Sequence, residues 1–465
     1  MNYQVSQHID NNKVFIVQRS EIEGRLDPKM ALYNRKVQNS LYPKVKLKDV
    51  LVCKPQYGAN EPGVPRSSIK EPRYIRITDI DENGLISHDE LGATAKIIEN
   101  KYILCENDIL IARSGATVGK AYIHKPALYD CFFAGYLIRF IINTDKALPE
   151  YIFTYTQLNA YKEWVNAIQR PSGQPNINSE EYQSLEIPLP NIERQQVIVD
   201  VIKSAYLQKK QKESEAKQLL DNVDAYILNE LGITLPEIKT DLKNRIFKVN
   251  RSELEERLDP TVYKDGIKLI SNNYDNVKLS SVAYVNPTGT FKGKDIETPI
   301  SFIPMESIDE VYSEVSKLEN TTIENASGFT KFKEGDLLWA KITPCMQNGK
   351  SAIAKNLTNG LGCGSTEFFV MRNKDERLAI EYLHVILHMK CVRETAMLYF
   401  GGSAGQQRVS SAFLENFNLP LPPKDKQIEI ANHIYTIRQK AKALQEEGKV
   451  LLEEAKRKVE SMIIG

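Results

Sequence analysis

The stretch "RSEIEGRLDP", residues 19–28, occurs again as "RSELEERLDP", residues 251–260, and this repetition decides the fold. Two further matches have the same separation of 232 residues. "IPLPNIERQQ", which begins at Ile187, corresponds to "LPLPPKDKQI", which begins at Leu419, and "SGQPNINSEEY" corresponds to "AGQQRVSSAFL". Because three separate matches share one offset, we interpret the chain as two tandem copies of one unit.

The bulk composition is that of a soluble globular protein, with 42% hydrophobic and 26% charged residues. A length of 465 residues predicts two to four domains. No apolar run reaches membrane-spanning length and the first residues lack a signal-peptide core, so we expect a cytoplasmic protein. The six cysteines include no CxxC pair, which argues against a disulfide framework and a zinc knuckle. A net charge of +1 neither requires nor excludes a nucleic-acid partner.

Each copy has the same internal order of predicted elements. Short β-like segments come first, and in copy one they are "RYIRITDI", "DILIAR", "GKAYI" and "YLIRFII". An apolar helical stretch follows, near residues 148–168 and 378–397, and then a polar Gly/Gln loop, a Pro-bounded strand and a long helix. The predicted fold class is therefore α+β, with two mixed α/β domains joined by two long helices.

The two long helices are the clearest secondary-structure prediction. No Pro or Gly lies between Pro190 and Gly232, and after Pro423 only Gly448 interrupts the pattern before the end. Apolar residues spaced mostly by threes and fours predict a heptad seam. Its predicted members are Ile198, Ile202, Ala205, Ala216, Leu219, Val223, Ile430, Ile434, Ile437, Ala441, Leu444, Leu451 and Ala455. Lys209 and Lys212 interrupt the first seam.

A helix of about 40 residues is roughly 60 Å long and cannot bury its apolar stripe alone, so the two helices are expected to pair. If the first carries the chain from one globule to the other, the second must return. This predicts an antiparallel coiled coil, an internal pseudo-two-fold and a near-circular chain. The alternatives are a spacer without further role, or two unrelated amphipathic core helices. The predicted boundaries are a first domain at 1–190, a helix at 191–232, a second domain at 233–422 whose first residues 233–250 form a linker, and a helix at 423–465.

This arrangement resembles the specificity subunit of Type I restriction–modification systems. The resemblance rests on the two "PLP…Q" junctions with their long helices, on "DILIAR…GK.YI" and "DLLWAK…GKSAI", and on the loops "SGQPNIN" and "AGQQRVS". It implies two target recognition domains that each read one half of a split, asymmetric DNA site. It also implies that the paired helices set the spacer length and help to dock two methyltransferase subunits.

The same resemblance implies a chain without catalysis or cofactor of its own. S-adenosylmethionine belongs to the methyltransferase partner, and ATP and Mg²⁺ belong to the restriction partner. Two alternatives remain open. One is the equivalent subunit of a related bipartite Type II system, and the other is a nucleotide-dependent enzyme built on "GATVGK". That segment has three residues between its glycines and lacks the hydroxyl after the Lys, and copy two reads "TPCMQNGK", so it is a poor phosphate-binding loop.

Three groups of polar side chains are candidate DNA contacts. Donors on loops suit phosphates and guanine, and Asn or Gln suits adenine. The first group is the basic loops: Arg66, Lys70, Arg73, Arg76, Lys292 and Lys294. The second follows a predicted strand: Arg113, Ser114, Thr117, Lys120, Lys341, Thr343, Gln347, Asn348 and Lys350. The third is the Gly/Gln loops: Arg170, Ser172, Gln174, Asn176, Asn178, Ser403, Gln406, Gln407 and Arg408.

Each group also has a purely structural interpretation. The basic loops are then solvated, Gly119-Lys120 is hairpin turn chemistry, and the Gly/Gln loops are flexible connections. His384 and His388 have the spacing of zinc ligands on a helix, but no third ligand is evident, so no metal site is predicted. Trp164 and Trp339 are expected in the cores.

Overall fold

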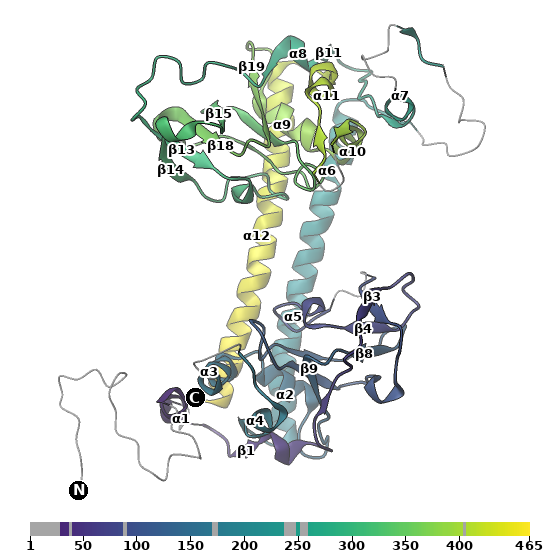
Figure 1. Ribbon diagram of the computed structural model, residues 1–465, viewed down its shortest axis with the longest axis vertical. Coiled ribbons are helices and arrows are strands. Elements are labelled where there is room, and N and C mark those ends of the chain that lie inside the picture. Colours follow the sequence, from purple (N-terminus) through teal and green to yellow (C-terminus); the bar gives the residue numbers. More distant parts are fainter. Residues whose placement is uncertain are drawn as a thin grey trace, which may run out of the picture. The chain divides into compact units, whose positions relative to one another are not determined.

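The computed structural model describes residues 28–36, 40–86, 91–169, 175–236, 248–251, 259–402 and 406–465. The chain divides into two compact units (Figure 1). Unit 1 comprises Met1–Gln211 and Glu447–Gly465, and unit 2 comprises Lys212–Glu446. Each unit is described on its own. None of the helices in these ranges combines the length and apolarity that crossing a bilayer requires.

Unit 1 contains two four-stranded sheets. One is wholly antiparallel, with the order β2–β9–β6–β7, and the other has the order β3–β5–β4–β8 with β4 parallel to β8. A short ladder, β1–β10, joins the beginning of the unit to its Pro-bounded strand. The strands are β1 (Lys44–Lys46), β2 (Gln56–Tyr57), β3 (Gly63–Pro65), β4 (Arg73–Ile75), β5 (Ala93–Ala95), β6 (Ile109–Ala112), β7 (Ala121–Ile123), β8 (Cys131–Phe133), β9 (Leu137–Phe140) and β10 (Glu186–Pro188). The short helices are α1 (Pro28–Lys36), α2 (Pro149–Tyr155), α3 (Asn159–Ile168) and α4 (Ser179–Gln183).

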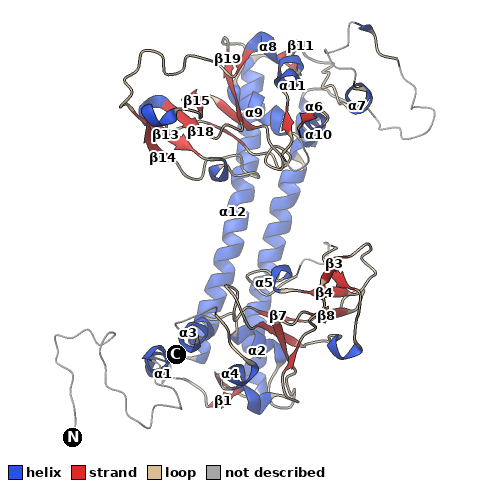
Figure 2. Ribbon diagram, in the orientation of Figure 1, coloured by secondary structure: helices blue, strands red, loops and turns tan. Residues whose placement is uncertain are grey.

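Unit 2 repeats this plan. Its antiparallel sheet has the order β12–β19–β16–β17, its second sheet has the order β14–β13–β18–β15 with β13 parallel to β18, and its short ladder is β11–β22 (Figure 2). The strands are β11 (Asn276–Lys278), β12 (Ala283–Val285), β13 (Pro299–Ile303), β14 (Glu319–Thr322), β15 (Thr330–Lys333), β16 (Leu337–Ala340), β17 (Ser351–Ile353), β18 (Leu361–Gly364), β19 (Phe368–Asn373), β20 (Phe400–Gly401), β21 (Arg408–Val409) and β22 (Asn418–Pro420). The short helices are α7 (Pro260–Asp265), α8 (Leu279–Val282), α9 (Ile380–His388), α10 (Lys390–Met397) and α11 (Ser411–Asn416).

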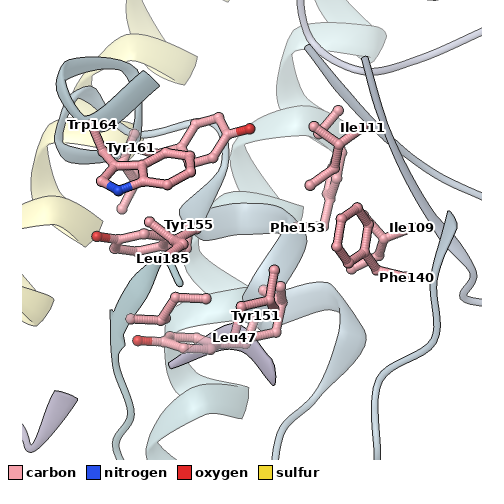
Figure 3. Close-up of a cluster of buried hydrophobic side chains, with 14 of the residues drawn as sticks. Leu47, Ile109, Ile111, Phe140, Tyr151, Phe153, Tyr155, Tyr161, Trp164 and Leu185 are labelled. Carbon is pink, nitrogen blue, oxygen red and sulfur yellow. The ribbon is translucent and has the colours of Figure 1, made fainter. Parts of the chain in front are cut away.

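Strand β6 explains why both units need two sheets. All four of its residues are buried, as in a strand covered on both faces. Since successive side chains alternate, Ile109 and Ile111 join the large core against the helices, while Leu110 and Ala112 join a second core. Figure 3 shows the large core, where Ile109 and Ile111 lie near Phe140 and Phe153. In strand β16, Leu337 and Trp339 join the large core of unit 2 and Leu338 joins its second core.

The two tryptophans lie in corresponding cores, which confirms their predicted burial. Trp164 and Trp339 are each 1% exposed. Trp164 stacks near Tyr161 in unit 1, and Trp339 stacks near Phe369 and Phe413 in unit 2. Each unit thus contains one buried tryptophan.

The apolar helical stretches are shorter than the sequence predicted. Residues 148–168 form two helices, α2 and α3, that are separated by Thr156–Leu158, and α9 and α10 divide at Met389 in the other copy. The first long helix, predicted as one element over 191–232, is α5 (Ile192–Asp221) followed by α6 (Val223–Glu230). The second, α12 (Lys424–Ile463), is uninterrupted.

The "PLP…Q" junction is a buried glutamine clamp. In unit 1, Gln195 is fully buried; its oxygen accepts the Leu148 N–H at 2.8 Å and its amide donates to Pro190 O at 2.8 Å. In unit 2, Gln427 accepts the Ala379 N–H at 2.9 Å. The clamp ties the first turn of each long helix to the start of the helical layer of its own globule, so the motif is a structural joint.

Gln427 makes one more bond than its counterpart. Its amide donates to both Pro422 O and Arg377 O, each at 2.8 Å. A tyrosine supports each joint, because Tyr151 donates to Pro188 O in unit 1 and Tyr382 donates to Pro420 O in unit 2.

A carboxylate from the far end of the opposite long helix completes each unit. In unit 1, Glu460 of α12 accepts the Ala160 N–H at 2.7 Å, at the start of α3. In unit 2, Asp224 of α6 accepts the Lys390 N–H at 2.8 Å, at the start of α10. Negative groups there satisfy otherwise free N–H groups and complement the helix dipole.

The contacts within unit 2 set the direction of its long helices. Glu215 lies 4.0 Å from Lys440, the Tyr226 ring lies 4.2 Å from the His433 ring, and Glu230 lies 2.6 Å from Lys426. As numbers rise along α5 and α6 they fall along α12, so the segments are antiparallel within this unit.

Most residues of the predicted seam are buried. Leu219, Ile437, Leu444 and Leu451 are only half-buried, and the fully buried leucine near the end of α12 is Leu452, at 2% exposure. In unit 1, Gly448 allows close approach to the interrupting Lys209, since a Cβ there would lie 3.3 Å from its Cγ.

Candidate nucleic-acid interface

Two of the predicted polar loops meet at one edge in each unit. In unit 1 the segment after β6 pairs with the Gly/Gln loop: Gly115 N donates to Pro175 O at 3.0 Å and Ile177 N donates to Arg113 O at 2.8 Å. Ser114 and Asn176 form an isolated antiparallel bridge between them. The Thr117 and Asn176 side chains are exposed.

Unit 2 repeats this pairing. Thr343 N donates to Gln407 O at 3.0 Å and Val409 N donates to Lys341 O at 2.9 Å, while Ile342 bridges to Arg408. Sequence reasoning identified the two loops separately but did not predict that they pair. We call the paired loops, residues 113–118 with 175–177 and residues 341–348 with 406–409, the reading edges of units 1 and 2.

A third segment borders each reading edge and was missed by the sequence. The Arg113 N–H donates to Tyr136 O at 3.0 Å, and the Lys341 N–H donates to Glu367 O at 2.9 Å. Tyr136 and Glu367 therefore occupy corresponding places before β9 and β19. Tyr136 is 63% exposed, so its ring lies at the surface beside the reading edge. The run "CFFAGYLIRF" gave no signal that one of its aromatic residues faces outwards.

The charged residues of the reading edges have partners within the protein. The Arg113 guanidinium lies 5.0 Å from the centre of the Tyr57 ring, and the Lys341 ammonium lies 5.5 Å from that of Phe369. Arg408 forms a bidentate pair with Glu367 at 2.8 and 2.9 Å. The hydrogen bond from Arg408 lowers the pKa of the Glu367 carboxyl below its ordinary value.

The amides of the unit 2 edge are also engaged. Asn348 is exposed and donates to the Glu310 carboxylate at 3.1 Å. Gln347 is half-buried, lies 3.9 Å from the Met397 sulfur, and accepts a bond from Arg393 at its carbonyl. Gln406 is exposed.

The two Gly-Lys pairs are hairpin elements. Gly119 has φ 86° and a Cβ there would lie 2.8 Å from Val165; Gly349 has φ 89°. The Lys120 ammonium donates to Ile80 O, and that of Lys350 donates to Met305 O at 3.2 Å. Both lysines thus tie the hairpin to a turn beside the second sheet, so we leave them out of the proposed interface. This geometry gives no support to a phosphate-binding loop.

The basic loop of unit 1 divides into buried and exposed residues. Arg66 is 3% exposed and Arg73 is 1% exposed. The Arg66 guanidinium donates to the carbonyls of Leu91, Ile69 and Glu71 and lies 4.3 Å from the centre of the Tyr129 ring. Because the Arg66 guanidinium is bound to these carbonyls and the Arg73 side chain is buried, both residues also leave the proposed interface.

The remaining basic candidates lie at the surface. Arg76 is half-exposed and bidentate to Asp79 at 3.0 and 3.1 Å, which raises the pKa of its guanidinium. Lys70, Lys292 and Lys294 are exposed. Arg170, Ser172, Gln174 and Ser403 lie outside the described residues. Asn178 is the N-cap of α4, with a capping box to Glu181.

His384 belongs to the interior of unit 2, whereas His388 is half-buried and its Nε2 lies 3.2 Å from Glu310 O. His384 is 6% exposed and its Nε2 lies 3.0 Å from the Ser351 hydroxyl. Burial and the nearby Arg438 charge lower the pKa of His384 to about 3, so the ring is neutral. Across the described ranges, no group of three or more His, Cys, Asp or Glu side chains has a geometry that could hold a metal ion.

Comparison with known proteins identifies the family. The family model described as the Type I restriction modification DNA specificity domain matches residues 70–221 and 271–453, one match in each copy. The chain belongs to this family. The two buried clamps and the two reading edges fall within the matched ranges.

Curated relatives carry related names. The chain is 35% identical over 164 residues to the Type I restriction enzyme EcoEI specificity subunit and 34% identical over 179 residues to the EcoAI specificity subunit, both of Escherichia coli. These alignments cover 35% and 38% of this chain but only 27% and 29% of the relatives, so each spans less than a third of the relative's length. The MjaVIII specificity subunit of Methanocaldococcus jannaschii is 19% identical over 375 residues, which cover 79% of this chain and 81% of that protein.

A solved structure shows a similar fold. A chain from a structural study of complex assembly and conformational transition of the type I R-M system aligns with a TM-score of 0.50 at 16% identity. The alignment covers 90% of this chain and 96% of that one.

Proposed function

We propose that this chain is the DNA specificity subunit of a Type I restriction–modification complex. Each unit reads one half of a split, asymmetric site, and unit 1 and unit 2 read different bases. The observation that carries this proposal is the reading edge, which the two units build from the same backbone pairing and then cover with different side chains. Half-site readers need such a constant frame with variable contacts.

The proposed contacts follow from exposure and chemistry. In unit 1 the Thr117 hydroxyl, the Asn176 amide and the Tyr136 ring lie outside the core, and an amide of this kind suits adenine in the major groove. In unit 2 we assign Thr343, Gln406, Gln407 and the Arg408–Glu367 pair to the edge. Lys70, Arg76, Lys292 and Lys294 are assigned to phosphates, which position the protein without reading bases.

We further propose that α5, α6 and α12 form one antiparallel pair that sets the distance between the half-sites. Support comes from the contacts of Glu460 and Asp224, through which each unit is completed by the far end of the other copy's long helix. In this proposal the pair also docks two methyltransferase subunits, and restriction subunits join through that complex. Methyl transfer from S-adenosylmethionine and ATP- and Mg²⁺-dependent restriction occur in those partners, inside the cytoplasm.

Methylome sequencing of cells that carry this chain with its partners tests the function. We expect a single motif in two parts with a fixed spacer, and loss of that motif when the chain is deleted. A continuous or palindromic motif, or methylation that does not depend on this chain, would contradict the proposal. Cleavage at a fixed distance on both sides of the site would instead favour a bipartite Type II system.

Exchange of one unit tests the proposal that each unit reads one half of the site. Replacing residues 29–186 by the corresponding domain of another such subunit is expected to change one half of the motif and leave the other half and the spacer unchanged. Thr117→Val and Asn176→Ala should each relax a base in that same half. Thr436→Val, a change at an exposed hydroxyl on α12, is the matched control and should leave both halves intact.

A further inference from the structure

Unit 2 contains a cavity of about 700 Å³ between the turn that follows β13, the helix α9 and the first half of α12. Arg438 of α12 lines this cavity and is 7% exposed. Within the described chain its guanidinium has neither a hydrogen-bond acceptor nor a carboxylate in ion-pair contact. A buried charge without a partner is costly, so its environment requires an explanation.

Two residues of the cavity lining carry further polar groups without a partner. The hydroxyls of Tyr312 and Ser313 are buried and, as far as the described residues extend, have no hydrogen-bond partner. Ser313 has φ 59°, a backbone conformation that favours glycine. The cavity thus presents one buried cation without an ion pair, and the two hydroxyls lie beneath its surface.

Nearby carboxylates are already engaged. The Glu314 carboxylate accepts bonds from Gln439 and Lys442, each at 2.6 Å. Asp224 accepts the Lys390 N–H. Glu381 and Lys355 are exposed residues of the cavity lining. Burial lowers the pKa of the Arg438 guanidinium to about 10, which leaves it charged at neutral pH.

Unit 1 shows that the fold does not require this cation. The residue 232 positions before Arg438 is Tyr206, and its hydroxyl donates to Asn83 O at 3.2 Å. Asn83 lies in the turn that corresponds to residues 309–314, because Ile80 bridges to Ile86 in one copy and Ile308 bridges to Val315 in the other. Unit 1 satisfies a polar group at the place where unit 2 leaves a buried cation without an ion pair.

We propose that the unit 2 cavity is a binding site for a small organic oxyanion, a carboxylate or a phosphate monoester, whose charged end contacts Arg438. The rest of the lining suits an apolar body of the ligand, because it includes Val315, Leu318, Ile353 and Val385. The volume lies in the range of ligand pockets. This site goes beyond the proposed DNA function and does not depend on it.

Calorimetric titration of the full chain tests the site with three probes: phenyl phosphate, benzoate and the neutral benzyl alcohol. We expect saturable binding of at least one anionic probe and weaker binding of benzyl alcohol. Which of the two anions binds more tightly distinguishes phosphate esters from carboxylates as the ligand class. Equal or weaker binding of both anions relative to benzyl alcohol overturns the proposal.

Two variants and a control make the test specific. Arg438→Tyr installs the residue of unit 1 and should weaken the anionic probe by about tenfold or more, as expected for the loss of a charge-assisted contact. Arg438→Met removes the charge and keeps most of the side-chain length, so it should weaken the anionic probe to a similar extent without loss of folding. Arg457→Tyr, at an exposed arginine of the same helix, should bind as the wild type does. Unchanged affinity in both Arg438→Tyr and Arg438→Met overturns the proposal.

Discussion

Units 1 and 2 share buried polar bonds and differ in surface residues. The glutamine clamp, the tyrosine bond to the Pro-bounded strand and an Asp–Arg pair at the start of β6 or β16 occur in both. Tyr136 and Glu367, by contrast, stand at corresponding positions of the two units but have unrelated side-chain chemistry. Selection for a constant frame with variable contacts explains this division, because a buried polar group that loses its partner is expensive whereas an exposed side chain is not.

The largest expected effect tests whether unit 1 depends on the end of α12. Leu452, Val459 and Ile463 are at most 2% exposed and belong to the large core of unit 1. Deletion of residues 447–465 removes them, and at roughly 1.5–3 kcal/mol for each buried side chain the loss is about 5 kcal/mol or more. We expect unit 1 to unfold while unit 2 keeps its own transition.

Tryptophan fluorescence in urea measures this difference. Trp164 reports on unit 1 in a Trp339→Phe background, and Trp339 reports on unit 2 in a Trp164→Phe background. Val450→Ala, at an exposed position of the deleted segment, is the control and should leave the Trp164 transition in place. A Trp164 transition that survives the deletion would contradict the dependence of unit 1 on α12.

The second effect compares the two Asp–Arg pairs. Asp336 is bound by Arg372 through two bonds of 2.7 Å, whereas Asp108 lies 3.4 Å from Arg139, which also donates to Ile103 O. Removal of one partner from a buried pair costs about 3–5 kcal/mol. Asp336→Asn should therefore destabilise unit 2 by about that amount.

Asp108→Asn should cost less, about 1–2 kcal/mol, because Arg139 retains its carbonyl partners. The same tryptophan pair measures both transitions. Equal losses in the two units would mean that the closer geometry of the Asp336 pair has no energetic consequence.

The third effect compares the clamps. Replacement of Gln427 by Met keeps the volume but leaves one N–H and two carbonyls without their partner, and Gln195→Met leaves one of each. At about 1–3 kcal/mol for each buried group left unsatisfied, with partial relaxation, Gln427→Met should cost about 2–4 kcal/mol and Gln195→Met somewhat less. Gln196→Met alters a neighbouring exposed side chain and should be silent. A larger loss of stability for Gln195→Met than for Gln427→Met would contradict the view that the cost follows the number of hydrogen bonds that each glutamine makes.

The buried residues that the two units share show how much of the fold the sequence could predict. The repeat offset located both clamps, and alternating apolar residues located β6, β7 and β16, because motif spacing and hydrophobic period are local properties of the chain. The division of residues 148–168 into two helices was not predicted. Thr156 and Gln157 are buried and hydrogen-bonded in the native structure, which no propensity reveals.

The candidate site was harder to predict than the fold. Arg66 and Arg73 had the composition of a DNA-binding loop, but tertiary structure buries both side chains, and the sequence does not show which charged residues are buried. Tyr136 was missed for the opposite reason. It stands in an apolar run between two strands, and in such a run an exposed aromatic residue cannot be distinguished from a buried one by sequence. The pairing of the two polar loops joins segments about 60 residues apart and follows from the sheet, not from either loop.

The smallest expected effect is a pH dependence of opposite sign in the two units. Burial raises the pKa of Asp108 in unit 1 despite Arg139, so the folded unit holds this proton more tightly than the unfolded chain does. Its contribution therefore favours folding at low pH and declines as pH rises from the ordinary carboxyl pKa of about 4 through the raised value. In unit 2, Arg408 lowers the pKa of Glu367, so that contribution is present above the ordinary pKa and is lost as pH falls through the lowered value.

Urea titrations at a series of pH values between about 3 and 7 resolve the two contributions when each wild-type transition is compared with its variant. The difference in unfolding free energy between wild type and Asp108→Asn should shift against the wild type as pH rises, by about 1 kcal/mol or less. The corresponding difference for Glu367→Gln should shift in favour of the wild type, and by a similarly small amount because the pair is partly solvated. Shifts of the same sign in both units would show that Arg139 outweighs burial at Asp108, and would remove the electrostatic difference between the two copies.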